Sequence, residues 1–198
     1  MALVAVDGPT GVGKSTTARA LGRALGAPVL LDPVSVSPLL DDYYTGEATP
    51  AAALAVELAF LRLRADLLVE PPGADLVVSD FSLLRTAPFS EFLASPDDRA
   101  VVLAAMREAM AAAARPDVLV LLRAEPATLL DRVRRRDRDA EGDLTVDHLA
   151  ALVEHFEAWH DELVAQSDHV IELDTAAWDP HRADDLASLT ARIRALLD

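Results

Sequence analysis

Cysteine is absent from this chain of 198 residues. Its absence excludes disulfides, thiolate zinc sites, iron–sulfur clusters and cysteine nucleophiles. Basic residues are scarce, since 18 of them stand against 33 acidic residues for a formal net charge of −15. A protein this acidic offers a poor surface for the phosphates of DNA, RNA or an anionic membrane. Lysine is rarest, because Lys14 is the only one and every other basic residue is an arginine.

Long apolar runs are missing as well. No segment approaches the ~18 uninterrupted apolar residues of a membrane span. The N-terminus has no basic flank and only about five apolar residues before Asp7, too few for a signal peptide. We therefore expect a cytoplasmic protein without membrane or nucleic-acid partners. With 52% hydrophobic residues the chain can bury a sizeable core, and its length fits a single domain, 1–198.

Short apolar runs alternate with longer helical patterns. The runs are rich in Val, Ile and Leu and bounded by Asp, Gly or Pro, as is typical of buried strands. We expect strands at 2–6, 29–31, 76–79, 118–122 and 169–173, and helices at 14–25, 49–69, 98–114, 126–136, 146–166 and 183–197. This alternation predicts an α/β fold with a five-stranded parallel sheet and helices on both faces. Residues 33–47 and 137–145 carry no strong pattern, and loops of this kind often carry function.

A phosphate-loop motif lies between the first expected strand and helix. Residues 8–15, Gly-Pro-Thr-Gly-Val-Gly-Lys-Ser, match the pattern G-x-x-x-x-G-K-[ST]. The glycines let backbone N–H groups cradle phosphates, Lys14 would neutralise the β and γ oxygens, and the Ser15 hydroxyl would bind Mg²⁺. An ordinary Gly-rich turn rarely needs Lys-Ser at this spacing. We expect nucleotide contacts from Gly8, Thr10, Gly11, Val12, Gly13, Lys14, Ser15 and Thr16.

The class of phosphate-loop protein follows partly by exclusion. A GTPase would need Asn-Lys-x-Asp to read guanine, but the only lysine is already at position 14. Motor and transporter ATPases need a longer chain. Small phosphotransferases therefore remain.

Several short motifs follow the phosphate loop in a fixed order. They are Asp-Pro-Val at 32–34, Ser-Pro-Leu-Leu at 37–40, Tyr-Tyr at 43–44, Glu57 seven residues before Arg64, Asp-Phe-Ser at 80–82, and Arg132 followed by Arg-Asp-Arg-Asp-Ala-Glu at 136–141. In this order and spacing, residues 3–175 resemble the deoxyribonucleoside kinases, particularly the bacterial deoxyadenosine/deoxyguanosine type. The resemblance implies a P-loop NTPase fold with an arginine-rich lid at about 132–145.

The resemblance also implies an activity and a set of roles. The activity is Mg²⁺-dependent transfer of the γ-phosphoryl group of ATP to the 5′-hydroxyl of a deoxynucleoside, with a purine favoured. Asp32 would be the base, and Ser15 and Asp80 would bind the metal. Lys14, Arg132, Arg136 and Arg138 would act on the phosphates, Tyr44 and Glu141 on the deoxyribose 3′-hydroxyl, Glu57 and Arg64 on the nucleobase, and Phe81 and Arg85 near the substrate.

The residues support these roles independently to different degrees. Asp32 and Asp80 each follow an expected strand, so they point into the crevice where α/β proteins bind ligands; turn-forming aspartates are the alternative. Glu57 and Arg64 lie two helical turns apart on one face, which would equally suit a solvent-exposed face. An ionised carboxylate at 57 accepts hydrogen bonds, which suits the N1–H and amino group of guanine.

The arginines at 132–138 allow two interpretations. A run of like charge is usually a solvated face, but phosphoryl transfer needs positive donors around the transferred group. Arg132 and Arg136 lie four residues apart, so both can face one site. We expect the second interpretation to hold.

Two departures from the family pattern leave alternatives open. Asp32 stands where the family has a longer glutamate, and Phe81 where most members have an arginine, with Arg85 as a hypothetical substitute. One alternative is a thymidylate-type nucleoside monophosphate kinase, and another is a binding or regulatory subunit with weakened chemistry. The resemblance suggests a homodimer; a heterodimer with a homologous kinase is the other possibility.

Overall fold

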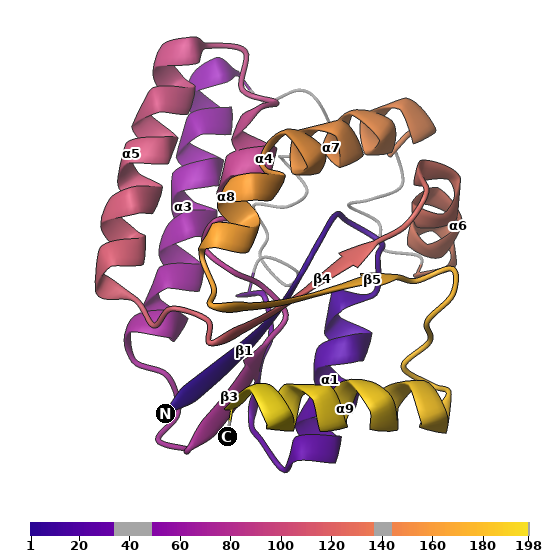
Figure 1. Ribbon diagram of the computed structural model, residues 1–198. Helices are drawn as coiled ribbons and strands as arrows, with labels where there is room; N and C mark the ends of the chain where they lie inside the picture. Colours follow the sequence, from indigo (N-terminus) through magenta and orange to yellow (C-terminus); the bar gives the residue numbers. More distant parts are fainter. Residues whose placement is uncertain (34–48, 137–143, 198) are drawn as a thin grey trace.

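A parallel sheet forms the centre of the computed structural model, which describes residues 1–33, 49–136 and 144–197. Its five strands lie in the order β2-β3-β1-β4-β5 (Figure 1). They are β1 (Ala2–Asp7), β2 (Val29–Leu30), β3 (Leu76–Ser79), β4 (Val118–Arg123) and β5 (His169–Asp174). The predicted parallel sheet is therefore confirmed, with β2 as a two-residue strand at one edge.

Helices cover both faces of this sheet. They are α1 (Lys14–Leu25), α3 (Pro50–Val69), α4 (Thr86–Ser90), α5 (Pro96–Ala112), α6 (Pro126–Arg136), α7 (Val146–Ala158), α8 (His160–Ala165) and α9 (Ala183–Leu197). Figure 1 shows α3 and α5 side by side on one face and α1 with α9 on the other. Side chains of β1 alternate between the two layers: Leu3 packs with the α3 and α5 side, whereas Val4 and Val6 pack with the α1 and α9 side. Among the described residues, no helix is both long enough and apolar enough to cross a membrane.

Two helices differ from the expected ranges. The pattern at 146–166 predicts one helix, but the chain breaks it at Trp159, whose indole N–H donates to Glu91 at 3.0 Å. The helix expected at 98–114 begins at Pro96 instead. There the Ser95 side chain caps it by accepting the Asp98 N–H at 3.2 Å, a standard start with proline in the first turn.

The topology gathers the strand ends that carry function. In parallel strands the carboxyl ends meet at one edge, and here that edge is followed by the phosphate loop after β1, Asp32 after β2 and Asp80 after β3. The segment after β5, beginning at Thr175, joins them. Segments far apart in the sequence therefore surround a single site.

Candidate active site

A cavity of about 960 Å³ opens at this edge of the sheet. It runs from Glu57, Phe60 and Arg64 on α3, across the phosphate loop, to the end of α6 and the loop between β5 and α9. A volume of this size can hold a drug-sized ligand. Residues 10–17, in the phosphate loop and the first turn of α1, line it as well.

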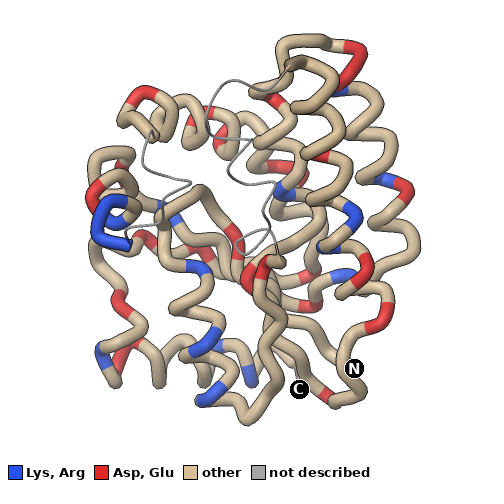
Figure 2. Tube along the Cα trace, turned by 180° about the vertical axis from the view of Figure 1, so that it is seen from behind, with Lys and Arg blue, Asp and Glu red and all other residues tan. Residues whose placement is uncertain are grey.

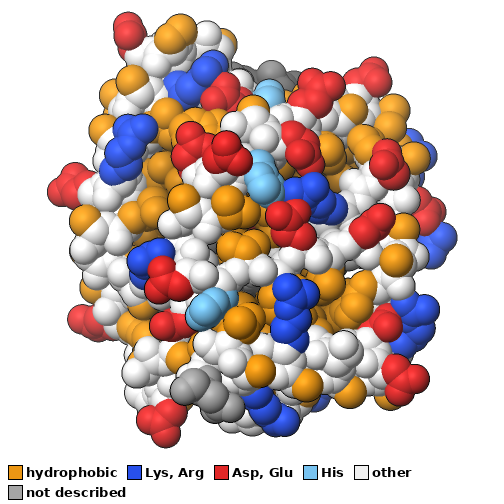
Figure 3. Space-filling view, viewed as in Figure 1, with side chains coloured by type: hydrophobic (Ala, Val, Ile, Leu, Met, Phe, Trp, Pro, Cys, Tyr) orange, Lys and Arg blue, Asp and Glu red, His pale blue; other side chains and the backbone are white. Residues whose placement is uncertain are grey.

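Positive charge is concentrated around this cavity. Among the described residues that line it, the cationic ones are Lys14, Arg19, Arg64, Arg85, Arg132, Arg135, Arg136 and Arg182. Figure 2 shows the basic run at the end of α6, and on the face seen in Figure 3 acidic and basic side chains are interspersed. The acidic average of the chain therefore surrounds a local basic site suited to a small anion.

The phosphate loop is held in a closed turn. Gly8 and Gly11 have φ angles of 138° and 84°, and a Cβ at either position would lie within 2.8 Å of a backbone carbonyl, that of Leu122 or Leu129. Glycine is therefore required at both positions. The Lys14 ammonium donates to the carbonyls of Gly8 and Pro9, each at 2.9 Å. These contacts hold the start of the loop against the side chain of Lys14.

Lys14 has an unusual acidity for a lysine. Burial and the nearby charge of Arg85 lower its pKa to about 7, although the carboxylates of Asp7, Asp80 and Asp32 oppose the shift. The site thus disfavours a positive charge on Lys14 until an anion arrives to balance it.

Asp80 links the phosphate loop to the end of β2. One oxygen of its carboxylate accepts the hydroxyl of Ser15, and the other accepts the backbone N–H of Asp32 at 2.5 Å. Oxygen ligands of this kind suit Mg²⁺, which keeps several waters and usually takes one or two carboxylates plus substrate phosphates. No cluster of three or more histidine, aspartate or glutamate side chains suited to a metal occurs in the described ranges. The Ser15 hydroxyl and the Asp80 carboxylate, which are in contact, are oxygen ligands of the kind that Mg²⁺ takes together with substrate phosphates.

Asp32 is held between two arginines. Arg64 donates from Nε and Nη2 to the two carboxylate oxygens at 3.1 and 3.2 Å, and Arg85 Nη1 lies 3.2 Å from Oδ2. Burial alone would lower the pKa of Arg64, but the charge and hydrogen bonds of Asp32 outweigh it and raise that pKa. The sequence analysis predicts a contact between Arg64 and the nucleobase. In the structure, the Arg64 guanidinium binds the carboxylate of Asp32, the proposed catalytic base.

Arg85 keeps its Nε available to donate to a ligand. Its side chain is buried and lines the cavity, with its guanidinium carbon 5.2 Å from the centroid of the Phe89 ring. Within the described residues, Nε has no hydrogen-bond partner, and Nη1 makes an ion pair with Asp32 but no hydrogen bond of good geometry. A buried donor without a partner is costly. An anion in the cavity beside Asp32 would remove that cost.

The expected contact of Phe81 with the substrate is wrong. Its side chain is fully buried and belongs to the hydrophobic core with Leu30, Leu61 and Leu83. Asp80 lines the cavity, whereas the side chain of the next residue, Phe81, packs into the core. Phe81 is therefore a core residue, and its side chain has no exposed surface that a substrate could contact.

The lid arginines have different environments. Arg132 donates to the Val12 carbonyl at 3.2 Å and to the hydroxyl and carbonyl of Thr175 at 2.7 and 3.1 Å. It thus ties the phosphate loop to the segment after β5. Arg136 lines the cavity near it. Tyr44, Arg138 and Glu141 lie outside the described residues.

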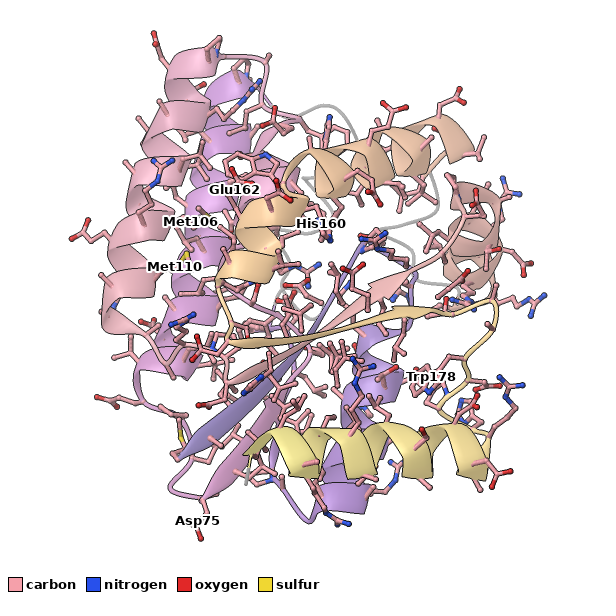
Figure 4. All side chains as sticks on the ribbon, in the orientation of Figure 1. Asp75, Met106, Met110, His160, Glu162 and Trp178 are labelled. Carbon is pink, nitrogen blue, oxygen red and sulfur yellow. The ribbon has the colours of Figure 1, made fainter. Side chains whose placement is uncertain are left out.

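Two features of the site were missed in the sequence. One is Asp7, which is fully buried next to the phosphate loop; an acidic residue ending a strand before that loop was a usable signal. The other is the loop between β5 and α9, which lines the far end of the cavity with residues including Thr175, Trp178 and Arg182. Figure 4 shows Trp178 in this loop, ahead of α9. A loop after the carboxyl end of a parallel strand was the signal there.

Comparisons with known proteins agree with this geometry. Deoxyguanosine kinase of Bacillus subtilis is 25% identical over 159 residues, covering 78% of this chain and 76% of that protein. Deoxyadenosine kinase of Dictyostelium discoideum is 26% identical over 167 residues, covering 81% and 66% respectively. The solved deoxyadenosine kinase of M. mycoides with dCMP and dCDP bound superposes with a TM-score of 0.82 at 18% identity, covering 98% of this chain and 99% of that one.

The match to a family model extends over nearly the whole chain. Residues 4–193 match the model described as deoxynucleoside kinase. The expected P-loop fold and kinase class are thereby confirmed. This chain belongs to the deoxynucleoside kinase family.

Proposed function

We propose that this kinase transfers the γ-phosphoryl group of ATP to the 5′-hydroxyl of a purine deoxynucleoside, with deoxyguanosine preferred. The observation that carries the proposal is the juxtaposition of Asp32 with the phosphate loop. Asp32 is tied through its backbone N–H to Asp80, and Asp80 accepts the hydroxyl of Ser15 in that loop. A carboxylate and a triphosphate site thus share one cavity.

Asp32 is the proposed base. In the reaction a bond forms between the 5′-oxygen and the γ-phosphorus, the bond to the ADP oxygen breaks, and the hydroxyl proton passes to the Asp32 carboxylate. Two guanidinium groups bind this carboxylate and fix its position. The loose transition state of phosphoryl transfer demands little base strength, so positioning matters more.

Arg85 is proposed to donate hydrogen bonds to the phosphate oxygens from the side of the cavity where the deoxynucleoside binds. Its Nε has no hydrogen-bond partner among the described residues, and its Nη1 is paired with Asp32, beside which the transferred group would carry its negative charge. This role would compensate for the aromatic residue at Phe81. Magnesium, bound by Ser15 and Asp80, would supply screening of the β and γ oxygens.

We assign one end of the cavity to the base of the deoxynucleoside and the other end to the base of ATP. Glu57, which is buried and lines the α3 end with Phe60, favours a base with adjacent N–H donors, as guanine has. The names of relatives, deoxyguanosine and deoxyadenosine kinase, support a purine. The far end, at the loop between β5 and α9, is the proposed place for the base of ATP.

One observation favours a second candidate, a nucleoside monophosphate kinase. The Nε of Arg85, which has no hydrogen-bond partner among the described residues, could donate to a phosphate already present on the acceptor. A phosphate-transfer assay with ATP and Mg²⁺ should compare deoxyguanosine, deoxyadenosine, deoxycytidine and their monophosphates. We expect turnover of the free nucleosides, with deoxyguanosine fastest.

Two other results of that assay would contradict the proposal. Turnover of monophosphates alone would establish the second candidate. No turnover of any acceptor, with intact ATP binding, would favour a regulatory subunit that acts with a homologous kinase.

A further inference from the structure

Asp7, the last residue of β1, makes a buried hydrogen-bond junction between two loops of the site. Its side chain is fully buried. Oδ1 accepts the backbone N–H of Gly8 at 2.8 Å, and Oδ2 accepts both the backbone N–H and the hydroxyl of Ser82 at 3.0 and 2.6 Å. Three donors from two segments therefore converge on one carboxylate, and Ser82 lies 75 residues after Asp7 in the sequence.

Each segment that Asp7 joins carries part of the nucleotide site. Gly8 begins the phosphate loop, and its carbonyl accepts the Lys14 ammonium. Ser82 lies two residues after Asp80, whose carboxylate accepts the Ser15 hydroxyl. Asp7 therefore fixes the first peptide of the phosphate loop relative to the turn after β3. A displacement of that peptide would turn the loop carbonyls and N–H groups away from their present directions.

Direct contact between Asp7 and a substrate is excluded by its surroundings. The carboxylate is closed off from solvent, and its two oxygens are occupied by three donors. A buried charge that is fully hydrogen-bonded is rigid, and its partners lose their geometry when it is replaced. The chemistry is that of a positioning residue.

We propose that Asp7 positions the phosphate loop for the triphosphate by clamping Gly8 to Ser82. This inference rests on the proposed function only in assigning phosphate binding to that loop. Asparagine has nearly the same shape but replaces one oxygen by an NH₂ group. Whichever way the amide turns, one backbone N–H, that of Gly8 or that of Ser82, then faces a donor.

The experiment measures binding of inorganic tripolyphosphate by titration calorimetry in EDTA, so that neither metal nor turnover contributes. We expect Asp7→Asn to raise the dissociation constant at least about tenfold, the size expected from one disrupted buried hydrogen bond. The dissociation constant of deoxyguanosine should change less than about threefold, because Asp80 keeps its contacts with Ser15 and Asp32. A general loss of structure would weaken both ligands alike.

Asp117→Asn, at an exposed aspartate, is the control. Asp117 also accepts a backbone N–H of β1, that of Leu3 at 2.7 Å, but at the opposite edge of the sheet. The Asp117→Asn substitution should lower the melting temperature and leave the dissociation constant of tripolyphosphate within about twofold of the wild-type value. Equal weakening by Asp7→Asn and Asp117→Asn would overturn the inference, as would unchanged binding in Asp7→Asn.

A milder variant covers the case in which Asp7→Asn does not fold. Ser82→Ala removes only the hydroxyl donor, and we expect a rise in the dissociation constant of about threefold. Unchanged tripolyphosphate binding in that variant would overturn the inference. Wild-type protein that binds no tripolyphosphate would instead overturn the proposed function.

Discussion

Arg64 grips both carboxylate oxygens of Asp32 with the fork formed by its Nε and Nη2. Bidentate pairs of this kind fix the plane of a carboxylate as well as its position. We therefore expect Arg64 to orient Asp32, the proposed catalytic base. We expect Glu57, two helical turns earlier on α3, to contact the nucleobase.

Replacing Arg64 tests whether it orients Asp32 or contacts the nucleobase. We expect Arg64→Gln to lower kcat by about 30-fold for deoxyguanosine and deoxycytidine alike, because the base loses its orientation for both. The ratio of the two kcat/KM values should stay within about threefold. Arg62→Gln, an exposed position on the same helix, is the control. A large change in the ratio with little change in kcat would restore Arg64 to the nucleobase.

Removing the charge of Asp32 tests the base itself. General base catalysis contributes ~10²–10⁴ in rate, so Asp32→Asn should lower kcat at least a hundredfold. Binding of ATP, measured by calorimetry, should change little because the phosphate loop is untouched. Turnover within about threefold of wild type would show that Asp32 is not the base.

Glu57→Gln tests base selection. Glutamine brings an N–H donor toward the N–H groups of guanine, so we expect kcat/KM for deoxyguanosine to fall about tenfold or more. Deoxyadenosine and deoxycytidine, which offer both donors and acceptors, should lose less. Glu70→Gln at the end of α3 is the control. Equal losses for all three nucleosides would argue against a contact between Glu57 and the base.

The lowered pKa of Lys14 predicts proton uptake on nucleotide binding. At pH 8 a group with a pKa of about 7 is mostly neutral, and a triphosphate favours its ammonium form. Calorimetric titration with ATP at pH 8, in buffers of different ionisation enthalpy, should therefore show protons taken up. Lys14→Met should abolish this uptake; the same uptake in the variant would assign it to another group.

The same pKa determines how Lys14 affects stability. The unfolded chain holds this proton up to its ordinary pKa of 10.5, but the ligand-free folded chain only up to about 7. The unfolded state thus binds more protons between pH 7 and 10.5. The contribution of Lys14 to the free energy of unfolding therefore rises with pH in that window and is lost as pH falls through 7.

We expect Arg132 to affect the binding of ATP, the phosphate donor, and not that of the deoxynucleoside. Because it ties the Val12 carbonyl to Thr175, Arg132→Gln should raise KM for ATP about tenfold and leave KM for the deoxynucleoside within about twofold. Arg134→Gln, exposed on the same helix, is the control. Steady-state kinetics with each substrate varied separately would measure both effects, and equal changes in both variants would indicate a mere loss of surface charge.

Local signals predicted much of the fold and of the phosphate site. Each strand is a short apolar run with polar boundaries, and the phosphate loop has a motif whose glycines meet specific carbonyls in the structure. Long-range contacts could not be predicted in this way. Trp159, where the helix breaks, donates to Glu91, 68 residues away, and Arg64 donates to Asp32, 32 residues away.

Motif position was a poor guide to the direction of side chains. Phe81 follows Asp80 in the sequence yet lies in the core, while Arg85, further along the loop, reaches Asp32. Only the backbone path after β3 decides which side chain enters the cavity.

The brevity of β2 has a consequence for solution measurements. Its ladder with β3 extends only to Leu30, yet the amide of Asp32 beyond it is held by the Asp80 carboxylate. Amide hydrogen exchange at Asp32 therefore reports the integrity of the acceptor side directly, since its protection comes from a site residue and not from the sheet. A single peptide, followed by mass spectrometry, can thus reveal a disturbed active site in a variant with no measurable turnover.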